Sequence, residues 1–210
     1  MSGDSKFFLG VVIAAVLVIG GIIIFSGNKN TDGGSADLDT SIGHKFGSDD
    51  AKVKIVEFGD FQCPACAAAA SEFRKAQTDN ADVQLIFRHF PLTSIHPNAV
   101  ISSQAAEAAA KQNKFWEIYD LLYERQEQWS ASDDPKTIFS GYAQELGLNV
   151  DQFNNDIDSD EVKAAVKRDL DYALEIDLNQ TPTFFINGVK VTGVQTADEW
   201  RQLIEKAKSS

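Results

Sequence analysis

The chain has 210 residues and a formal net charge of −12 at pH 7. An acidic surface repels phosphate backbones and anionic headgroups, so this charge argues against nucleic-acid binding and against docking on an anionic membrane surface. Only two residues are cysteine, which excludes a small fold stapled by several disulfides.

The N-terminal region contains a long apolar segment. Residues 7–25 are all apolar or glycine, and a helix of this length reaches roughly 28 Å, about the thickness of the hydrocarbon core of a bilayer. The segment is longer than the usual apolar region of a signal peptide, and no A-x-A-like cleavage pattern follows it. The sequence predicts a short tail over 1–6 and a transmembrane anchor over 7–25, with the rest of the chain outside the cytoplasm. A cleaved signal peptide and a buried core helix are the alternatives.

The next segment differs in composition. Residues 26–43 are rich in Gly, Ser, Asn and Asp and contain little to bury, which predicts a flexible linker. Residues 44–210 are sufficient for a single domain with its own core.

The domain begins with a strand–helix–strand pattern. Residues 52–59 carry apolar side chains on both faces, which is typical of a central strand covered on both sides. Residues 64–78 are alanine-rich and have proline in the first turn, which predicts a helix. Residues 83–90 predict a second strand.

A helical region then extends from about 98 to 178. Its periodicity and capping residues predict four helices, over 98–111, around 115–122, from Asp134-Pro135 to near Gly147, and over 159–177.

Strand signals return after this region. Residues 184–186 and 189–192 flank Asn187-Gly188, a strong hairpin signal. Thr196 and Glu199 form a capping box that begins a last helix. The predicted order is β-α-β, an all-helical insertion, then β-β-α, an α/β arrangement.

Both cysteines belong to one motif, Cys63-Pro64-Ala65-Cys66, between a predicted strand and a predicted helix. This is the arrangement of a thiol–disulfide redox centre. Residues three apart on a helix lie on one side, so the two sulfurs can approach closely enough to form a disulfide. Cys63 is placed at the helix N-terminus, where the helix dipole favours the thiolate, which is the attacking species.

Two other interpretations of the motif remain open, half of a zinc site and an inert structural disulfide. A zinc site needs two further ligands, and the only histidines, His44, His89 and His96, have no obvious ligand spacing. The sequence therefore predicts no metal and no organic cofactor. His89 and His96 are expected to be packing or loop residues.

Two residues near the motif are candidates for supporting roles. Glu57 shares a strand face with Val53 and Ile55, so burial is expected to raise its pKa and make it a proton carrier. The alternative is an edge position in contact with solvent. Phe61 is expected to contact substrate, with core packing as the alternative.

Several motifs together resemble the DsbA family of thioredoxin-fold proteins, especially its membrane-anchored forms. They are the Glu57-Phe58 and Cys63-Pro64-x-Cys66 spacing, the helical insertion, and the segments 87–92, 96–99, 115–116 and 181–188. The resemblance covers about residues 52–207.

The resemblance implies a thioredoxin fold with an inserted all-helical subdomain. It also implies that Cys63 is the exposed nucleophile, that Cys66 is its buried partner in a redox-active disulfide, and that Glu57 is the buried acid beneath the pair. Pro182 would be a cis-proline facing the disulfide, and Thr181 would offer backbone hydrogen bonds to an extended substrate peptide. An ordinary trans proline is the alternative.

This sequence departs from the best-known oxidising members, which carry histidine at the position of Ala65. Thr181 is also shared with reductase and isomerase relatives. The supporting residues of the motif are thus Glu57, Pro64 and Ala65, and the direction of electron flow is open.

The predicted function is that of an extracytoplasmic, membrane-tethered thiol oxidase that introduces disulfides into exported proteins with free cysteines. By resemblance, a membrane partner of the DsbB or vitamin-K-epoxide-reductase type would reoxidise it. The alternatives are a reductase or isomerase of the same fold and, in another class, a tethered peptide-binding chaperone module.

Overall fold

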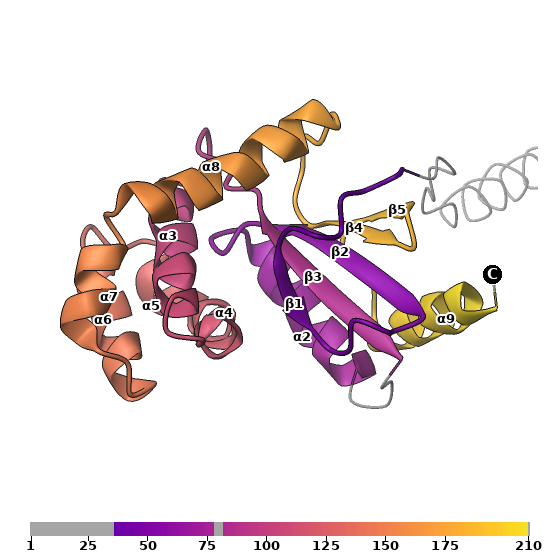
Figure 1. Cartoon of the computed structure of the whole chain (residues 1–210), viewed down its shortest axis with the longest axis horizontal. Coiled ribbons are helices and arrows are strands. Elements are labelled where there is room, and N and C mark those ends of the chain that lie inside the picture. Colours follow the sequence, from indigo (N-terminus) through magenta and orange to yellow (C-terminus); the bar gives the residue numbers. More distant parts are fainter. Residues whose placement is uncertain (1–35, 78–81, 210) are drawn as a thin grey trace, which may run out of the picture. The chain divides into compact units, whose positions relative to one another are not determined.

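The computed structural model describes residues 36–77 and 82–209 (Figure 1). The predicted tail over 1–6, the predicted anchor over 7–25 and most of the predicted linker lie outside these residues. No helix in the two described stretches combines the length and the apolar character needed to cross a bilayer.

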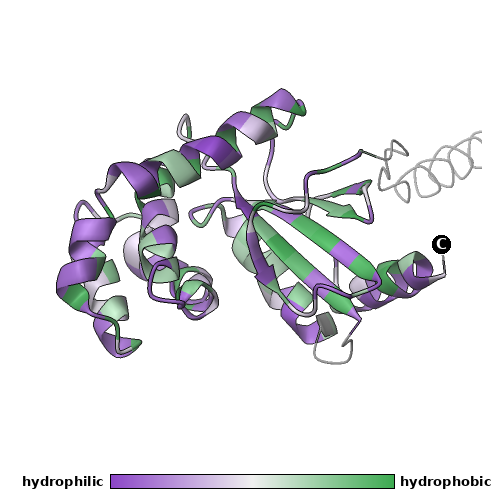
Figure 2. Ribbon diagram, viewed as in Figure 1, coloured by the Kyte–Doolittle hydropathy of each residue, from purple (hydrophilic) through white to green (hydrophobic). Residues whose placement is uncertain are grey.

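A five-stranded sheet in the order β1-β3-β2-β4-β5 forms the centre of the domain. β2 and β3 are parallel, whereas β4 runs antiparallel to β2 and places Phe184 opposite Glu57. Hydropathy colouring shows that the central strands are largely apolar (Figure 2). The strands are β1 (His44–Phe46), β2 (Val53–Gly59), β3 (Val83–His89), β4 (Thr183–Ile186) and β5 (Val189–Thr192).

Eight helices accompany this sheet in the described residues. They are α2 (Pro64–Gln77), α3 (Ala99–Ala110), α4 (Phe115–Glu124), α5 (Gln126–Trp129), α6 (Pro135–Glu145), α7 (Val150–Asp156), α8 (Asp160–Glu175) and α9 (Ala197–Lys208).

Helices α2 and α9 cover one face of the sheet. The Trp200 ring of α9 packs edge-on against Phe73 of α2 and Phe184 of β4, with ring centroids 5.1 and 4.8 Å apart. The predicted capping box begins α9, since Thr196 and Glu199 exchange side-chain and backbone hydrogen bonds. Burial of these aromatic rings stabilises the packing on this face.

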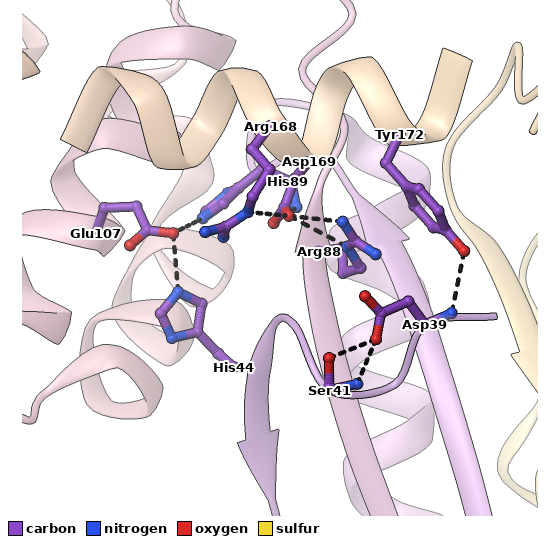
Figure 3. A network of polar contacts seen from close by, with 9 residues as sticks. All are labelled: Asp39, Ser41, His44, Arg88, His89, Glu107, Arg168, Asp169 and Tyr172. Carbon is purple, nitrogen blue, oxygen red and sulfur yellow. Dashed lines mark hydrogen bonds and ion pairs between the residues drawn. The ribbon is translucent and has the colours of Figure 1, made fainter. Parts of the chain in front are cut away.

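Helix α8 contributes to the core on the other face of the sheet. Ala173 belongs to the same buried cluster as Val56 and Phe185. A buried ion pair joins the two elements, because Asp169 of α8 lies 3.1 Å from a guanidinium nitrogen of Arg88 on β3 (Figure 3). Removing one partner from such a pair costs about 3–5 kcal/mol, because the other charge is left buried.

The helical insertion between β3 and β4 comprises α3 to α8. The apolar side chains of α3 to α7 make a third core cluster, which also contains Phe61, Cys66 and Phe87. The segment that carries the two cysteines is therefore packed against the insertion.

The predicted Asn-Gly hairpin is confirmed. Asn187 and Gly188 both have positive φ, 46° and 84°, as a two-residue hairpin turn between β4 and β5 requires. Glycine at the second position meets this requirement without a Cβ clash.

Three short elements were not predicted, β1, α5 and α7. The strand β1 is only three residues long and is held by antiparallel pairing with β3. The local sequence does not predict this long-range contact. Asn149 is the N-cap of helix α7, and its side chain accepts a hydrogen bond from the backbone N–H of Gln152 at 3.0 Å.

The predicted linker over 26–43 extends too far. The backbone N–H of Ala36 donates to the Gly188 carbonyl at 2.9 Å, and that of Asp39 donates to the Tyr172 hydroxyl at 3.1 Å. Leu38 packs against the core cluster beneath α8. Residues 36–43 therefore belong to the domain, which begins before residue 44.

Candidate active site

The motif lies at the N-terminus of α2, directly after β2 and a short loop. The backbone N–H groups of Cys66 and Ala67 donate to the Cys63 carbonyl at 3.0 and 3.2 Å, which places Cys63 at the start of the first turn. Both cysteines are free and buried in this structure. Cys63 retains 7% of its surface, whereas Cys66 has none.

The environments of the two sulfurs push their pKa values apart. A hydrogen bond from Cys66 is the main cause that lowers the pKa of Cys63 to about 5; burial opposes it, and backbone N–H groups and Thr181 reinforce it. Burial raises the pKa of Cys66 well above its ordinary value, and the hydrogen bond to Cys63 raises it further. At neutral pH Cys63 is therefore the thiolate and Cys66 the thiol.

The segment before β4 faces Cys63. The Thr181–Pro182 peptide bond is cis, and the Thr181 carbonyl oxygen lies 3.6 Å from the Cys63 sulfur, which donates a hydrogen bond to it only when protonated. Pro182 is buried, and its carbonyl accepts the backbone N–H of Gly193 at 3.2 Å. The proline loop is thus fixed beside Cys63.

Glu57 lies beneath the pair and retains only 1% of its surface. Burial raises the pKa of its carboxyl to about 8, although a hydrogen bond from Tyr119 opposes the shift. That bond joins the Tyr119 hydroxyl to Glu57 Oε2 at 3.0 Å, while Oε1 has no partner among the described residues. A Glu57 charge would also raise the pKa of Cys66, so the two groups are coupled.

Asp60 holds the loop between β2 and the motif. Its buried carboxylate accepts the backbone N–H of Gln62 at 2.8 Å and that of Leu92 at 2.9 Å. Nδ1 of His96 lies 2.7 Å from the same carboxylate. His96 is thus a loop residue, as predicted.

Two glutamines connect the motif to the helical insertion. The Gln62 amide donates to the Ser130 carbonyl at 2.7 Å, and its oxygen accepts the Asn98 backbone N–H at 2.6 Å. The Gln126 amide of α5 donates to the carbonyls of Phe61 and Cys63 at 2.6 and 3.1 Å. The insertion therefore fixes the backbone that carries Cys63.

A family model described as Thioredoxin matches residues 39–206 of the chain. The probable disulfide bond formation protein D of Bacillus cereus is 34% identical over 201 residues, which cover 90% of this chain and 91% of that protein. The chain belongs to the thioredoxin family. The predicted resemblance to its DsbA-like thiol:disulfide oxidoreductases is confirmed.

Solved structures show the same fold at lower identity. Oxidised BdbD from Bacillus subtilis matches this thioredoxin-family chain with a TM-score of 0.72 and 23% identity, covering 85% of this chain and 100% of that one. Alpha-DsbA1 of Wolbachia pipientis matches with a TM-score of 0.70 and 21% identity, covering 79% of this chain and 90% of that one.

Other relatives are much longer proteins. The Na(+)/H(+) antiporter NhaA 1 of Salinispora arenicola is 37% identical over 151 residues, which are 72% of this chain but 22% of the antiporter. The chain thus spans about a fifth of the length of these relatives.

The structure brings most of the predicted site residues together. Cys63 and Cys66 share the first turn of α2, with Pro64 exposed and Ala65 half-buried between them. The expected burial of Glu57 is confirmed, and the alternative of an edge position is wrong.

Phe61 is the exception among the predicted site residues. Its side chain is fully buried and stacks against Phe87, with ring centroids 5.1 Å apart. The structure supports core packing, the alternative given for this residue, because a side chain without exposed surface cannot meet a substrate.

Sequence reasoning missed Tyr119, Gln62 and Gln126. Tyr119 and Gln126 lie more than sixty positions from the residues that they contact. For Tyr119, the available signal was a hydroxyl on the largely apolar buried face of α4.

Proposed function

We propose that the protein is a membrane-tethered, extracytoplasmic thiol oxidase that introduces disulfide bonds into exported proteins. A substrate thiolate attacks Cys63 of the Cys63–Cys66 disulfide, that S–S bond breaks, and a mixed disulfide forms while Cys66 leaves and takes up a proton. A second substrate thiolate then attacks the substrate sulfur of the mixed disulfide and expels Cys63. The substrate loses two electrons and gains a disulfide, and the enzyme gains both electrons as its dithiol.

The observation that carries this proposal is the low pKa of Cys63, about 5, beside a Cys66 whose pKa is raised. A thiol of low pKa is a good leaving group, and a stabilised thiolate makes the disulfide more oxidising. Ala65 supplies no charge, but the Cys66 thiol and the backbone N–H groups at the start of α2 stabilise the anion instead.

Glu57 is proposed as the proton donor to the departing Cys66. With a pKa raised to about 8 by burial, Glu57 is mostly protonated at neutral pH and is able to act as an acid. The pKa of Cys66, which would receive this proton, is also raised, so the Cys66 thiolate is a strong base that takes a proton readily.

Thr181 is proposed to bind the substrate backbone. It is half-buried and precedes the cis-proline beside the nucleophile. An extended peptide placed there would bring its cysteine to Cys63. Unlike Cys66, Cys63 keeps some exposed surface.

The tether and the redox partner complete the proposal. The apolar segment over 7–25 anchors the chain, and a membrane protein of the DsbB or vitamin-K-epoxide-reductase type reoxidises it. The match to disulfide bond formation protein D over 90% of the chain supports this arrangement. An alkaline wash of membranes tests the tether. The full chain is expected to stay with the membranes, and a variant that begins at Asp32 is expected to be released.

The reduction potential of the full chain, equilibrated with glutathione, tests the direction of electron flow. A potential well above that of thioredoxin, about −270 mV, is the result expected for an oxidase. A potential near or below that value favours the reductase alternative, for which Ala65 and Thr181 are the relevant features. If the Cys63→Ser/Cys66→Ser variant still assists client folding, the protein is a chaperone module instead.

A further inference from the structure

Three side chains that the redox chemistry does not use converge on the side of the sheet where α3 lies. His44 comes from β1, His89 is the last residue of β3, and Glu107 lies on α3. Nε2 of His44 and Nε2 of His89 lie 2.9 and 3.0 Å from the same oxygen, Oε1 of Glu107 (Figure 3). One ligand atom from each residue lies within 4.8 Å of the other two.

We propose that His44, His89 and Glu107 form a binding site for a divalent transition-metal ion of the zinc class. Two imidazole nitrogens and one carboxylate oxygen are ligands that such ions prefer. Metal–ligand bonds of about 2.0 to 2.1 Å place tetrahedral ligands about 3.3 Å apart. The observed separations of 2.9 and 3.0 Å need only a small expansion to admit an ion.

The ligand set distinguishes zinc-class ions from calcium and magnesium. Calcium and magnesium take oxygen ligands almost exclusively, and magnesium requires near-octahedral geometry. A site in which two of three protein ligands are imidazoles therefore disfavours both. The Glu107 carboxylate supplies the one negative charge of the site when both histidines are neutral.

Aromatic packing fixes both imidazole rings. The His44 ring stacks on Phe115 with ring centroids 3.5 Å apart and an interplanar angle of 9°. The His89 ring is fully buried and packs edge-on against Phe87, with ring centroids 5.2 Å apart. Because these rings are held before an ion arrives, little side-chain entropy is lost on binding.

An open cavity of about 580 Å³ gives access to the site. It is lined by Gly43, His44, Glu107, Glu161, Ala164, Ala165 and Arg168. The side chains of His44 and Glu107 are 22% and 11% exposed, whereas His89 is closed off. An ion would enter from this cavity, and a water molecule there would complete the coordination.

Two charged groups face the cavity besides the proposed ligands. The Nε atom of Arg168 lies 3.5 Å from Asp169, which offsets part of the repulsion that the guanidinium exerts on a cation. Glu161 is paired with Lys111 at 2.5 Å. The net charge of −12 on the whole chain favours the approach of cations.

The ion would join parts of the chain that are far apart in sequence. The strands β1 and β3 belong to the sheet, whereas α3 belongs to the helical insertion. An ion bound to all three elements binds only the folded state, so it raises the unfolding temperature, and the stabilisation grows with the logarithm of the ratio of ion concentration to Kd.

The test uses the untagged full chain with Cys63→Ser and Cys66→Ser, because thiolates and histidine tags also bind zinc. After treatment with a chelator, Zn²⁺ binding is measured by calorimetry, Co²⁺ binding by its visible absorption, and thermal unfolding with and without each ion. We expect one Zn²⁺ per chain, a higher unfolding temperature with Zn²⁺, and little response to Ca²⁺ or Mg²⁺.

Two ligand variants and one control make the test specific. His44→Phe keeps a ring on Phe115 but removes a ligand, and Glu107→Gln keeps the shape of the carboxylate; each is expected to weaken Zn²⁺ binding about tenfold or more. His96→Ala, which removes the one histidine outside the site, is expected to leave the affinity unchanged. Absence of saturable Zn²⁺ binding, or an affinity unchanged in His44→Phe, overturns the proposal.

Discussion

At the scale of single residues, the two sulfurs of the motif differ in ionisation although they lie one helical turn apart. Cys63 keeps some exposed surface and receives hydrogen bonds, whereas Cys66 is fully buried. Burial penalises a thiolate and hydrogen bonding stabilises it, so the same chemical group is acidic at one position and weakly acidic at the other. The direction of attack follows from this difference.

The reduced protein should be alkylated at Cys63 with a rate that follows a titration centred near pH 5. Because the hydrogen bond from Cys66 is the main cause of the low pKa, Cys66→Ala should shift the midpoint upward. Cys66→Ser, which retains a donor, should shift it less. Iodoacetamide labelling across pH measures all three proteins, and equal midpoints would contradict this account of the thiolate.

Glu57→Gln should slow thiol exchange about tenfold or more at neutral pH, because the variant cannot give a proton to the departing Cys66. In the wild type, the rate should fall as pH rises through about 8, where Glu57 loses its proton. Stopped-flow exchange with a dithiol substrate measures both effects. Glu175→Gln, at an exposed position of α8, is the matched control.

The stability of Glu57→Gln provides a second readout. A carboxyl whose folded pKa is raised contributes stability that is complete below its unfolded pKa of 4.5 and is lost as pH rises through about 8. The variant should therefore gain stability relative to the wild type over this interval. The acid role of Glu57 would be ruled out if two quantities stayed constant with pH. They are the exchange rate of the wild type and the difference in stability between Glu57→Gln and the wild type.

At the scale of elements, the close packing of β2 against the helical insertion depends on a glycine. A Cβ at Gly59 would lie 2.5 Å from a ring carbon of Phe87, 3.0 Å from the Tyr123 hydroxyl and 3.1 Å from Glu57 Oε1. The ring and both polar groups are buried, so none of them has free space into which to move.

Gly59→Ala should thus lower the free energy of unfolding by about 1–3 kcal/mol through overpacking. Gly141→Ala is the matched control, because a Cβ at that position in α6 meets nothing within 4 Å. Alanine has the higher helix propensity, so Gly141→Ala should raise stability by up to about 1 kcal/mol. Urea unfolding of both variants checks that the change in the free energy of unfolding has opposite signs in the two.

Gln62 has a similar role between elements, since it links the motif loop to the insertion. Gln62→Ala leaves the Asn98 backbone N–H without its side-chain acceptor and removes one of the two side-chain donors to the Ser130 carbonyl, which should reduce stability by about 1–3 kcal/mol. Gln144→Ala on the exposed side of α6 should change it by less than about 0.5 kcal/mol. Equal urea midpoints for the two variants would exclude this structural role.

The elements that sequence predicted are those with strong local signals. The central strand, the helix after the motif, the Asn187-Gly188 hairpin and the capped last helix all depend on residues close together in the chain. The strand β1 and the attachment of residues 36–43 depend instead on distant partners, such as Phe87 for His44 and Gly188 for Ala36. Periodicity carries no information about such contacts.

The candidate site divides in the same way. Cys63, Cys66 and Glu57 were identified because a motif and a strand pattern mark them. Tyr119 and the His44–His89–Glu107 cluster were not, because only the folding of the insertion against the sheet brings those residues together.

At the scale of the whole molecule, the oxidising strength of the disulfide is a difference in stability between two folded states. The reduced state contains the Cys63 thiolate, whereas the oxidised state contains no thiolate. Any free energy that the fold gives to the thiolate therefore stabilises the reduced chain and favours transfer of electrons to it from a substrate.

The sign of the pH dependence follows from linkage. The pKa of Cys63 in the folded chain, about 5, lies below its unfolded value of 9.0. The stability that the Cys63 thiolate gives to the reduced chain is therefore complete above pH 9. This contribution is lost as pH falls through 5. The raised pKa of Cys66 matters only at higher pH, and the titration of Glu57 largely cancels because Glu57 is present in both states.

The unfolding temperature of the reduced chain, minus that of the oxidised chain, should therefore increase steadily from pH 5 to pH 8. Differential scanning calorimetry of both redox states measures this difference. In Cys63→Ala, which has neither a thiolate at this position nor a disulfide, the unfolding temperature should not respond to reductant at any pH. A difference that stays flat with pH in the wild type would mean that the Cys63 thiolate does not make the disulfide oxidising, and the proposed direction of electron flow would lose its physical basis.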